Sequence, residues 1–171
     1  WPAASKMVLV TLMFVGACAG STGGGIKVSR CVIMVKTLFK EMGSYLHPNS
    51  IKKIKLDGKP VEHDVLRSIN VFFITYMLLF CASVFVVSLE GQDMVTNFTA
   101  VAATFNNIGP GLEGVGPTRN FGSLSILSKY TLMFDMLAGR LEIFPLLLLF
   151  HPGVWKEWAT KSTRLPRIAK A

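Results

Sequence analysis

The chain is poor in the residues that build enzyme active sites, disulfide frameworks and metal sites. Of its 171 residues, 16% are Asp, Glu, Lys or Arg, and only three are histidines. No histidine stands beside a nucleophile in a recognisable arrangement, so no catalytic residue and no enzymatic activity are predicted. Cys18, Cys31 and Cys81 are odd in number and lie in or beside apolar segments, so we expect small buried side chains without disulfides.

Apolar residues take the place of these missing types. They make up 51% of the chain, and mean hydropathy is +0.47. Residues 69–89 contain no charge and would measure about 31 Å as a helix, which matches the hydrocarbon core of a bilayer. The sequence therefore predicts an all-α membrane protein in contact with a lipid bilayer.

The net charge of +8 is distributed unevenly along the chain. Residues 36–67 hold seven basic and four acidic residues, and the tail after Phe150 holds five basic and one acidic residue. Residues 90–122, between the apolar segments, hold three acids and only Arg119 as a base. This alternation fits the positive-inside rule, with the Lys-rich loop and the C-terminus in the cytoplasm. No nucleic-acid recognition motif is present, so we expect no nucleic-acid partner.

A glycine-dense stretch, residues 19–27, follows the apolar residues 5–17. Four of the six residues 20–25 are glycine, and each glycine costs roughly 1 kcal/mol relative to alanine inside a helix. Lipid tolerates irregular backbone only where it is buried in protein or lines an aqueous cavity. We therefore expect residues 5–17 to form a re-entrant pore helix whose glycine break lines an ion pathway. The alternative is a helix-packing interface, because Gly16 and Gly20 also form a GxxxG pair.

A second glycine break has the same surroundings. Residues 96–105 predict a short helix capped by Thr96 or Asn97, residues 106–111 break it, and residues 129–150 predict a membrane crossing. His-Pro pairs close both copies, at residues 47–48 and 151–152. The pattern predicts repeats of outer helix, pore loop and inner helix.

The cytoplasmic segment between the copies, residues 49–67, contains Asp57-Gly58 between short β-prone runs, which indicates a hairpin. It is either a simple connector or a docking surface. Residues 109–114 satisfy GxGxxG but lack the strand and helix of a dinucleotide site. Residues 20–27 resemble a phosphate-binding loop, but Val28 stands where that loop requires Ser or Thr.

Three motifs together resemble the Trk/Ktr potassium-uptake family, and within it the TrkH/TrkG type of membrane subunit. They are residues 14–27 (FVGACAGSTGGGIK), residues 106–111 (NNIGPG) and residues 139–142 (GRLE). The resemblance covers nearly the whole chain and implies a pseudo-fourfold, potassium-channel-like pore built from four repeats of one polypeptide. The chain looks like residues 1–48 of a third repeat (pore loop and inner helix), the loop 49–67, a complete fourth repeat at 68–153 and a basic tail at 154–171.

The resemblance also implies the site. Potassium would be bound by backbone carbonyls at Gly20 and Gly109, because carbonyl rings replace the ion's hydration shell. The implied filter residues are Cys18, Ala19, Gly20, Ser21, Thr22, Asn107, Ile108, Gly109, Pro110 and Gly111. No covalent cofactor is implied. The implied partners are the remaining repeats of the polypeptide, a second copy in a homodimer, and a cytosolic nucleotide-binding Trk regulatory subunit, at a bacterial inner membrane.

Arg140 matches the family arginine that projects into the pore below the filter and acts there as an electrostatic barrier. Helical spacing puts Asp135 and Glu142 on one face and Arg140 well away from it, which favours a pore-facing arginine. A structural ion pair with Glu142 or another repeat is the alternative. Pro145 predicts a kink beside Arg140, because it removes a backbone bond to Leu141. Lys36 is a second mid-depth cation that can extend to the membrane surface.

The leading hypothesis is potassium uptake by a fragment of a Trk-type transporter subunit. The alternative is a non-conducting membrane helix-packing or scaffold module.

Overall fold

The computed structural model describes residues 2–18, 20–21, 23–47, 54–56, 58–141 and 143–156. These residues are mostly helical. The elements are α1 (Ala3–Phe14), α2 (Val28–Leu46), β1 (Lys55–Leu56), β2 (Lys59–Pro60), α3 (His63–Ser88), α4 (Met94–Phe105), η1 (Glu113–Val115), η2 (Phe121–Ser123), α5 (Ile126–Arg140) and α6 (Ile143–Phe150).

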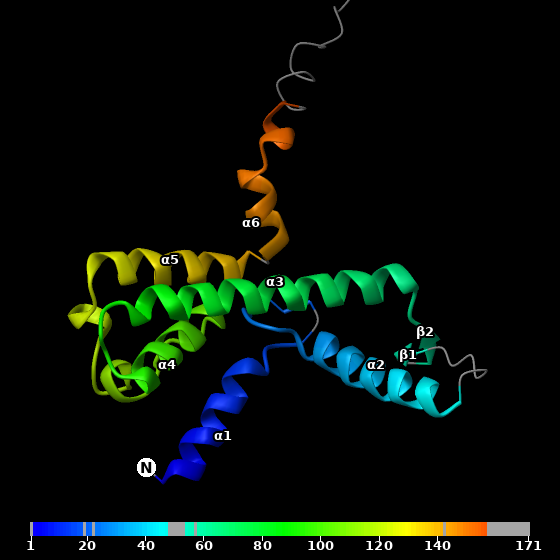
Figure 1. Cartoon of the computed structure of the whole chain (residues 1–171), viewed down its shortest axis with the longest axis horizontal. Helices are drawn as coiled ribbons and strands as arrows, with labels where there is room; N and C mark the ends of the chain where they lie inside the picture. The colour runs from blue at the N-terminus through cyan, green and yellow to red at the C-terminus, as the bar shows by residue number, and fades with distance from the viewer. Residues whose placement is uncertain are drawn as a thin grey trace, which may run out of the picture.

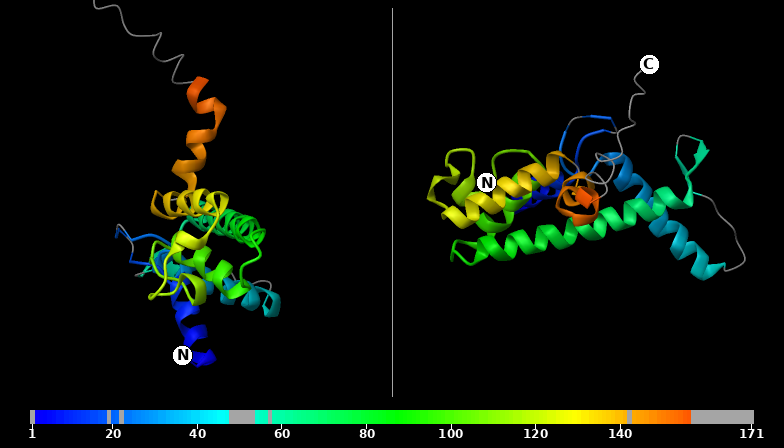
Figure 2. Two further views of the ribbon diagram at one scale, coloured as in Figure 1. Left: turned by 90° about the vertical axis from the view of Figure 1, so that its left-hand side faces the viewer. Right: turned by 90° about the horizontal axis from the view of Figure 1, so that it is seen from above.

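The long helix α3 organises the fold (Figure 1). Helix α5 runs alongside one half of α3, and α4 packs against both. Helix α2 lies beside the other half of α3, toward the hairpin of β1 and β2. Helices α1 and α6 extend away from this body on opposite sides, and the left view of Figure 2 shows the same projection of α6 from a second side.

The core lies where α3, α4 and α5 meet. The ring of Tyr76 from α3 packs edge-on against Phe105 from α4, with centroids 4.7 Å apart. Phe14 at the end of α1 joins the same cluster through Phe80, at 5.4 Å. Ala100 and Ala103 of α4 are fully buried, and small side chains allow membrane helices to approach one another closely.

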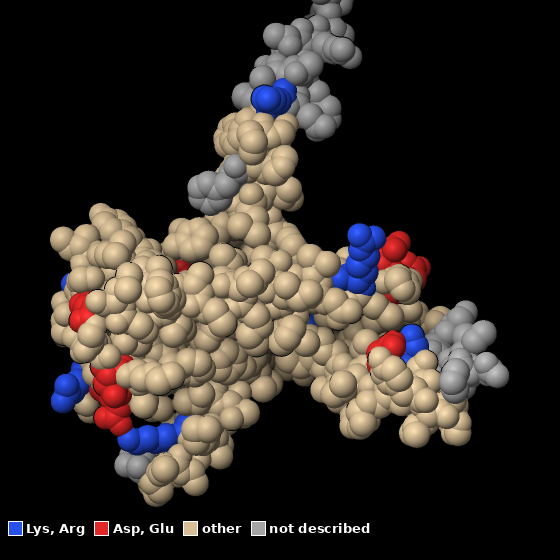
Figure 3. All heavy atoms as spheres, in the orientation of Figure 1, with Lys and Arg blue, Asp and Glu red and all other residues tan. Residues whose placement is uncertain are grey.

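Among the described residues, α3 alone has both the length and the composition of a membrane-crossing helix. Only 28% of its apolar window is buried within the chain. On the face drawn in Figure 3, Lys, Arg, Asp and Glu gather toward the two ends of α3, and the broad surface between them is almost uncharged.

The structure confirms helices in each predicted apolar segment and confirms the kink predicted beside Arg140, although residues 129–150 do not form one continuous helix. Helix α5 ends at Arg140, and α6 begins at Ile143 and turns sharply away (Figure 1). Pro145 explains this break, because its ring cannot accommodate the carbonyl four residues earlier. Proline is tolerated in the first turn of a helix, where Pro145 stands in α6. Glu142 lies outside the described residues.

The hairpin predicted at Asp57-Gly58 is confirmed: Lys55 pairs with Pro60 and Leu56 with Lys59. Gly58 has a φ of +79°, as such a two-residue turn requires. Lys36 Nζ donates to the Lys55 carbonyl at 2.9 Å, so the amine extends from α2 to the hairpin. Asp57 itself and residues 49–53 lie outside the described part of the chain, as does the tail from residue 157.

The cysteine prediction is partly wrong. All three cysteines are free, but Cys18 and Cys81 are exposed and Cys31 is half-buried. Apolar side chains in a membrane protein need no burial within the chain, because lipid is itself an apolar environment.

Candidate functional site

The first glycine loop joins α1 to α2 and is closed at its base by backbone hydrogen bonds. The Gly16 N–H donates to the Ile26 carbonyl at 2.9 Å, and the Val28 N–H donates to the Ala17 carbonyl at 3.1 Å. Within the loop, Gly20 has a φ of +81° and Gly25 a φ of +78°. The left-handed region favours glycine, so these two positions let the chain reverse and enter α2. Ala19 and Thr22 lie outside the described residues.

The second glycine loop leaves the end of α4. The Ile108 N–H donates to the Ala103 carbonyl at 2.9 Å, and Asn107 (φ 56°) and Gly109 (φ +111°) turn the chain out of the helix. Asparagine is the residue besides glycine that most often ends a helix in this way. Thr99 Oγ1 then accepts from the Leu112 N–H at 3.0 Å and draws the loop back over α4.

The cap of α4 differs from the prediction. Asp93 caps the helix by accepting from the Val95 N–H at 3.1 Å, whereas Thr96 and Asn97 lie within the helix. Thr96 Oγ1 instead accepts from the Gly114 N–H at 3.0 Å, and Asn97 donates to the Gln92 carbonyl. These side chains hold the outer loops onto α4, which the sequence pattern could not distinguish from capping.

The two glycine loops lie side by side. A Cβ placed on Gly24 would lie 2.6 Å from Asn107 Nδ2, and one on Gly25 would lie 2.6 Å from Asn106 Oδ1. Neither distance is possible for a real side chain, so glycine is required for this contact. Gly24 and Gly25 thus allow the first loop to pack against the second as well as to turn.

Helices α3 and α5 hold the asparagines of the second loop. The Tyr76 hydroxyl on α3 donates to Asn106 Oδ1 at 3.0 Å, and Asn107 Nδ2 donates to the Met136 carbonyl on α5 at 3.3 Å. Gly139 of α5 packs so closely that a Cβ there would lie 1.9 Å from the Phe105 carbonyl oxygen. Sequence reasoning missed the roles of Tyr76, Asn106 and Gly139, because no local pattern marks contacts between distant helices.

The described residues of the two loops that the resemblance assigns to a filter are mostly at the surface of the chain. Cys18, Gly20, Ser21, Ile108, Gly109 and Pro110 are exposed, Asn107 is half-buried, and Gly111 is buried. No atom lies within 4 Å of the position that a Cβ would take on Gly20 or Gly109. Both glycines therefore have an open side, whereas Gly111 packs against Thr99 and Val115 and anchors its loop.

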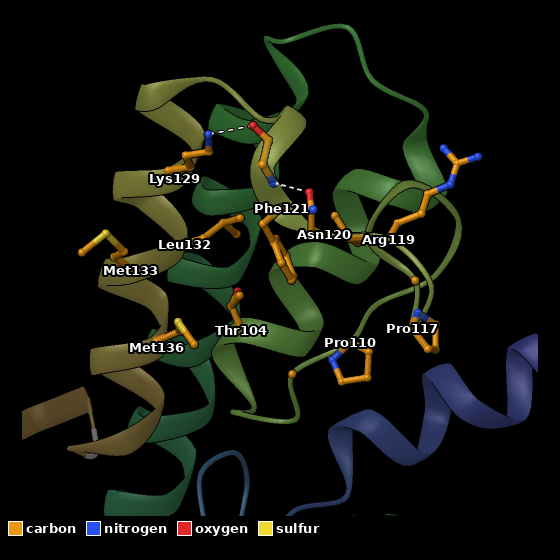
Figure 4. Close-up of a pocket in the computed structure, with 14 residues that line it drawn as sticks. Thr104, Pro110, Pro117, Arg119, Asn120, Phe121, Lys129, Leu132, Met133 and Met136 are labelled. Atoms are coloured by element: carbon orange, nitrogen blue, oxygen red, sulfur yellow. Dashed lines mark hydrogen bonds between the residues drawn. The ribbon is translucent and has the colours of Figure 1, made fainter.

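A groove of about 640 Å³ borders the second loop. In Figure 4, one wall of the groove is lined by Leu132, Met133 and Met136 of α5. Pro110 of the second glycine loop and Phe121 of η2 lie across from them. The lining is mainly apolar. Lys129 at the rim donates to the Gly122 carbonyl at 2.8 Å, which ties the outer loop to α5.

Arg140 is the last residue of α5 and its side chain is exposed. It forms no hydrogen bond or ion pair within the described part of the chain. Asp135 points elsewhere: it is fully buried and accepts from the Ser83 hydroxyl of α3 at 2.6 Å. The two charged residues therefore lie in different environments, as the helical spacing predicts.

Two acids secure the loops at the end of α3 that is opposite the hairpin. Glu113 pairs with Lys6 of α1, and the pKa of its carboxyl is lowered by that hydrogen bond and by the charge of the amine. Glu90 accepts from the Ser128 hydroxyl at 2.6 Å and from the Ser125 N–H at the start of α5. The hydrogen bond from Ser128, and then those from Ser125, lower the pKa of Glu90.

Comparison with known proteins gives this arrangement a class. The structure superposes on the crystal structure of the potassium transporter TrkH from Vibrio parahaemolyticus with a TM-score of 0.80 and 38% sequence identity, over 91% of this chain and 33% of that one. The helices and their paired glycine loops are thus those of a membrane cation-transport protein. The chain belongs to the TrkH family of cation transport proteins, whose sequence profile matches residues 1–156.

Its relatives are potassium uptake proteins of Trk systems. The chain is 40% identical to TrkH of Salmonella typhimurium over 157 residues, 35% identical to TrkG of Escherichia coli and 32% identical to TrkI of Halomonas elongata. Each match covers 92% of this chain and 32% of the relative, so the chain spans about a third of their length. The resemblance to TrkH and TrkG drawn from the motifs is confirmed, and these relatives are transporters rather than enzymes.

Proposed function

We propose that the chain is part of a potassium uptake protein and supplies two segments of its selectivity filter. The observation that carries the proposal is the pairing of the two glycine loops, with Gly24 and Gly25 against Asn107 and Asn106. Two loops of the same kind, each with a positive-φ glycine open on one side, meet at one place in the fold.

In this proposal, the backbone carbonyls of residues 18–22 and 107–111 face the ion, centred on Gly20 and Gly109. Potassium enters a filter when carbonyl oxygens replace its hydration shell, and positive φ values help to orient successive carbonyls. Two segments form half of a fourfold ring. The other half comes from the remaining repeats of the same polypeptide, consistent with the chain spanning about a third of its relatives.

The proposed architecture assigns α3 as outer helix, α4 with its loop as re-entrant pore loop, and α5 with α6 as inner helix of one repeat. Helix α1, the first loop and α2 form the corresponding part of the preceding repeat. The Lys-rich loop 49–67 and the tail 154–171 are cytoplasmic, in a multi-pass protein of the bacterial inner membrane.

The proposed partners follow from the family. A second copy forms a homodimer, and a cytosolic nucleotide-binding regulatory subunit binds the cytoplasmic face at residues 51–66 or at the basic tail. The names of the relatives support a multi-component arrangement, because each is described as part of a Trk system.

The proposal is tested by Gly20→Ser and Gly109→Ser in the full-length parent, with Rb⁺ and Na⁺ uptake measured in proteoliposomes. We expect each variant to lose Rb⁺ flux or its preference over Na⁺. A side chain in the left-handed region costs roughly 1–2 kcal/mol and would displace the carbonyls at the ion.

Gly91→Ser is the matched control. Gly91 has a φ of +76° and equally open surroundings, but it lies in the loop after α3. It carries the same backbone strain and should keep its selectivity. Unchanged flux and selectivity in both filter variants would favour the alternative, a non-conducting helix-packing or scaffold module.

A further inference from the structure

Asp135 is a buried acid without a basic partner inside the membrane-facing part of the fold. It lies on α5, is 0% exposed, and its Oδ1 accepts from Ser83 on α3 at 2.6 Å. Its second oxygen, Oδ2, is buried and has no hydrogen-bond partner within the described residues. An ionised carboxylate with one free oxygen is costly in such a place.

Among the described residues, the helices packed against α5 place no basic side chain beside Asp135. Arg30 of α2 borders a small cavity beside Ala138 and Gly139, where its guanidinium lies over the Phe72 ring, 4.1 Å from the ring centroid. Helices α4 and α6 contain no ionisable side chain, and α3 faces the site with Ser83 and with Tyr76, whose hydroxyl is bonded to Asn106. On α5 itself, Lys129 is bonded to the Gly122 carbonyl and Arg140 is exposed.

We propose that Asp135 is a proton-binding site through which pH acts on the second filter loop. A proton on Oδ2 removes the charge and leaves Oδ1 free to accept from Ser83. The chemistry favours a proton over a metal ion, because no cluster of three or more His, Cys, Asp or Glu side chains occurs within the described residues.

The position of Asp135 links the proton to the filter loop. The next residue, Met136, accepts from Asn107 through its carbonyl, and Gly139, one turn further on, contacts the Phe105 carbonyl. Loss of the proton would place an unpaired charge between α3 and α5 and would weaken the packing that holds this loop. Uptake should therefore fall on the alkaline side.

Infrared spectroscopy of the full-length parent at mildly acidic pH tests proton occupancy directly. We expect a carbonyl band of a protonated carboxylic acid that is absent in Asp135→Asn and retained in Asp64→Asn, an exposed aspartate at the far end of α3. An unchanged band in Asp135→Asn would overturn the proposal. If Asp135→Asn does not fold, Ser83→Ala should keep the band at a shifted frequency, and its loss would contradict a neutral acid.

Rb⁺ uptake against pH tests the functional consequence, and this measurement alone rests on the proposed function. In the wild type, the protonated fraction falls about tenfold per pH unit once the acid titrates. Wild-type uptake should fall together with the protonated fraction. Folded Asp135→Asn should instead keep, as the pH rises, the uptake rate that it has at neutral pH. Coincident profiles, or an inactive but folded Asp135→Asn, would contradict the proposed role. The infrared band does not depend on transport. The two measurements therefore distinguish failure of the proposed transport function from failure of the proposed proton site.

Discussion

At the scale of single residues, the absence of a side chain matters most where two loops or a loop and a helix touch. Gly24, Gly25 and Gly139 each lie where a Cβ would collide with the second glycine loop or the end of α4 that precedes it. Gly20 and Gly109 differ, because their surroundings are open and their backbone angles are the special feature. Glycine therefore has two distinct physical roles in this chain, close packing and backbone conformation.

Gly139→Ala should destabilise the full-length parent by about 1–3 kcal/mol, as expected for overpacking a tight contact. The new methyl group would lie 1.9 Å from the Phe105 oxygen, so α5 and the filter loop must move apart. Thermal unfolding in detergent measures the effect. Gly43→Ala, on α2 with no atom within 4 Å, is the control and should be neutral or slightly stabilising. Equal stability of both variants would contradict the contact.

Arg140→Ala should raise transport velocity in the full-length parent, by roughly two- to tenfold, because it removes a positive charge from the proposed ion pathway. The side chain is exposed in this chain and has no partner within the described residues, which supports a role toward the pore. Initial rates of Rb⁺ uptake provide the measurement. A purely structural arginine would instead reduce the amount of folded protein and leave the rate per molecule unchanged.

At the scale of elements, Ser83 near the end of α3 donates to Asp135 of α5, and Glu90, just beyond the end of α3, accepts from Ser128 of α5. The Glu90 carboxylate bonds the N-terminus of α5, where a negative charge is also favoured by the helix dipole. Helix α6 contacts α3 and α5 and then projects from the body (Figure 1).

The Glu90 contact predicts acid sensitivity. Its folded pKa is lowered by the Ser128 and Ser125 hydrogen bonds, so its contribution is complete above the ordinary glutamate value of about 4.3 and is lost as pH falls below it. Glu90→Gln should lower stability at neutral pH by at most about 1 kcal/mol and reduce the acid dependence of the unfolding temperature. Glu41→Gln, in an exposed pair with Lys40, is the control. Identical acid profiles of wild type and Glu90→Gln would contradict the prediction.

At the scale of the whole molecule, the chain exposes many large apolar side chains. Phe39 is 66% exposed, Leu78 67% and Phe85 67%. Such surfaces are unfavourable in water but suit lipid or further transmembrane helices. The chain spans about a third of the length of its relatives, so in the proposed function the remaining repeats would cover part of this surface.

The sequence by itself determined the helices, the two glycine breaks, the hairpin and the family. These features depend on local properties. The length of an apolar segment, the density of glycine and short motifs can be recognised without knowing the tertiary contacts. Gly20 and Gly109 could be chosen from their motifs, and both have positive φ values.

Only the tertiary structure decided which glycines contact the neighbouring loop, what holds Asn106 and Asn107, and where Asp135 is buried. The Asp93 cap departed from the sequence prediction, whereas the break between Arg140 and Ile143 falls where Pro145 predicted a kink. The physical reason is the same in each case. These features depend on contacts between residues far apart in the chain, such as Tyr76 with Asn106 and Ser83 with Asp135, which no local pattern specifies.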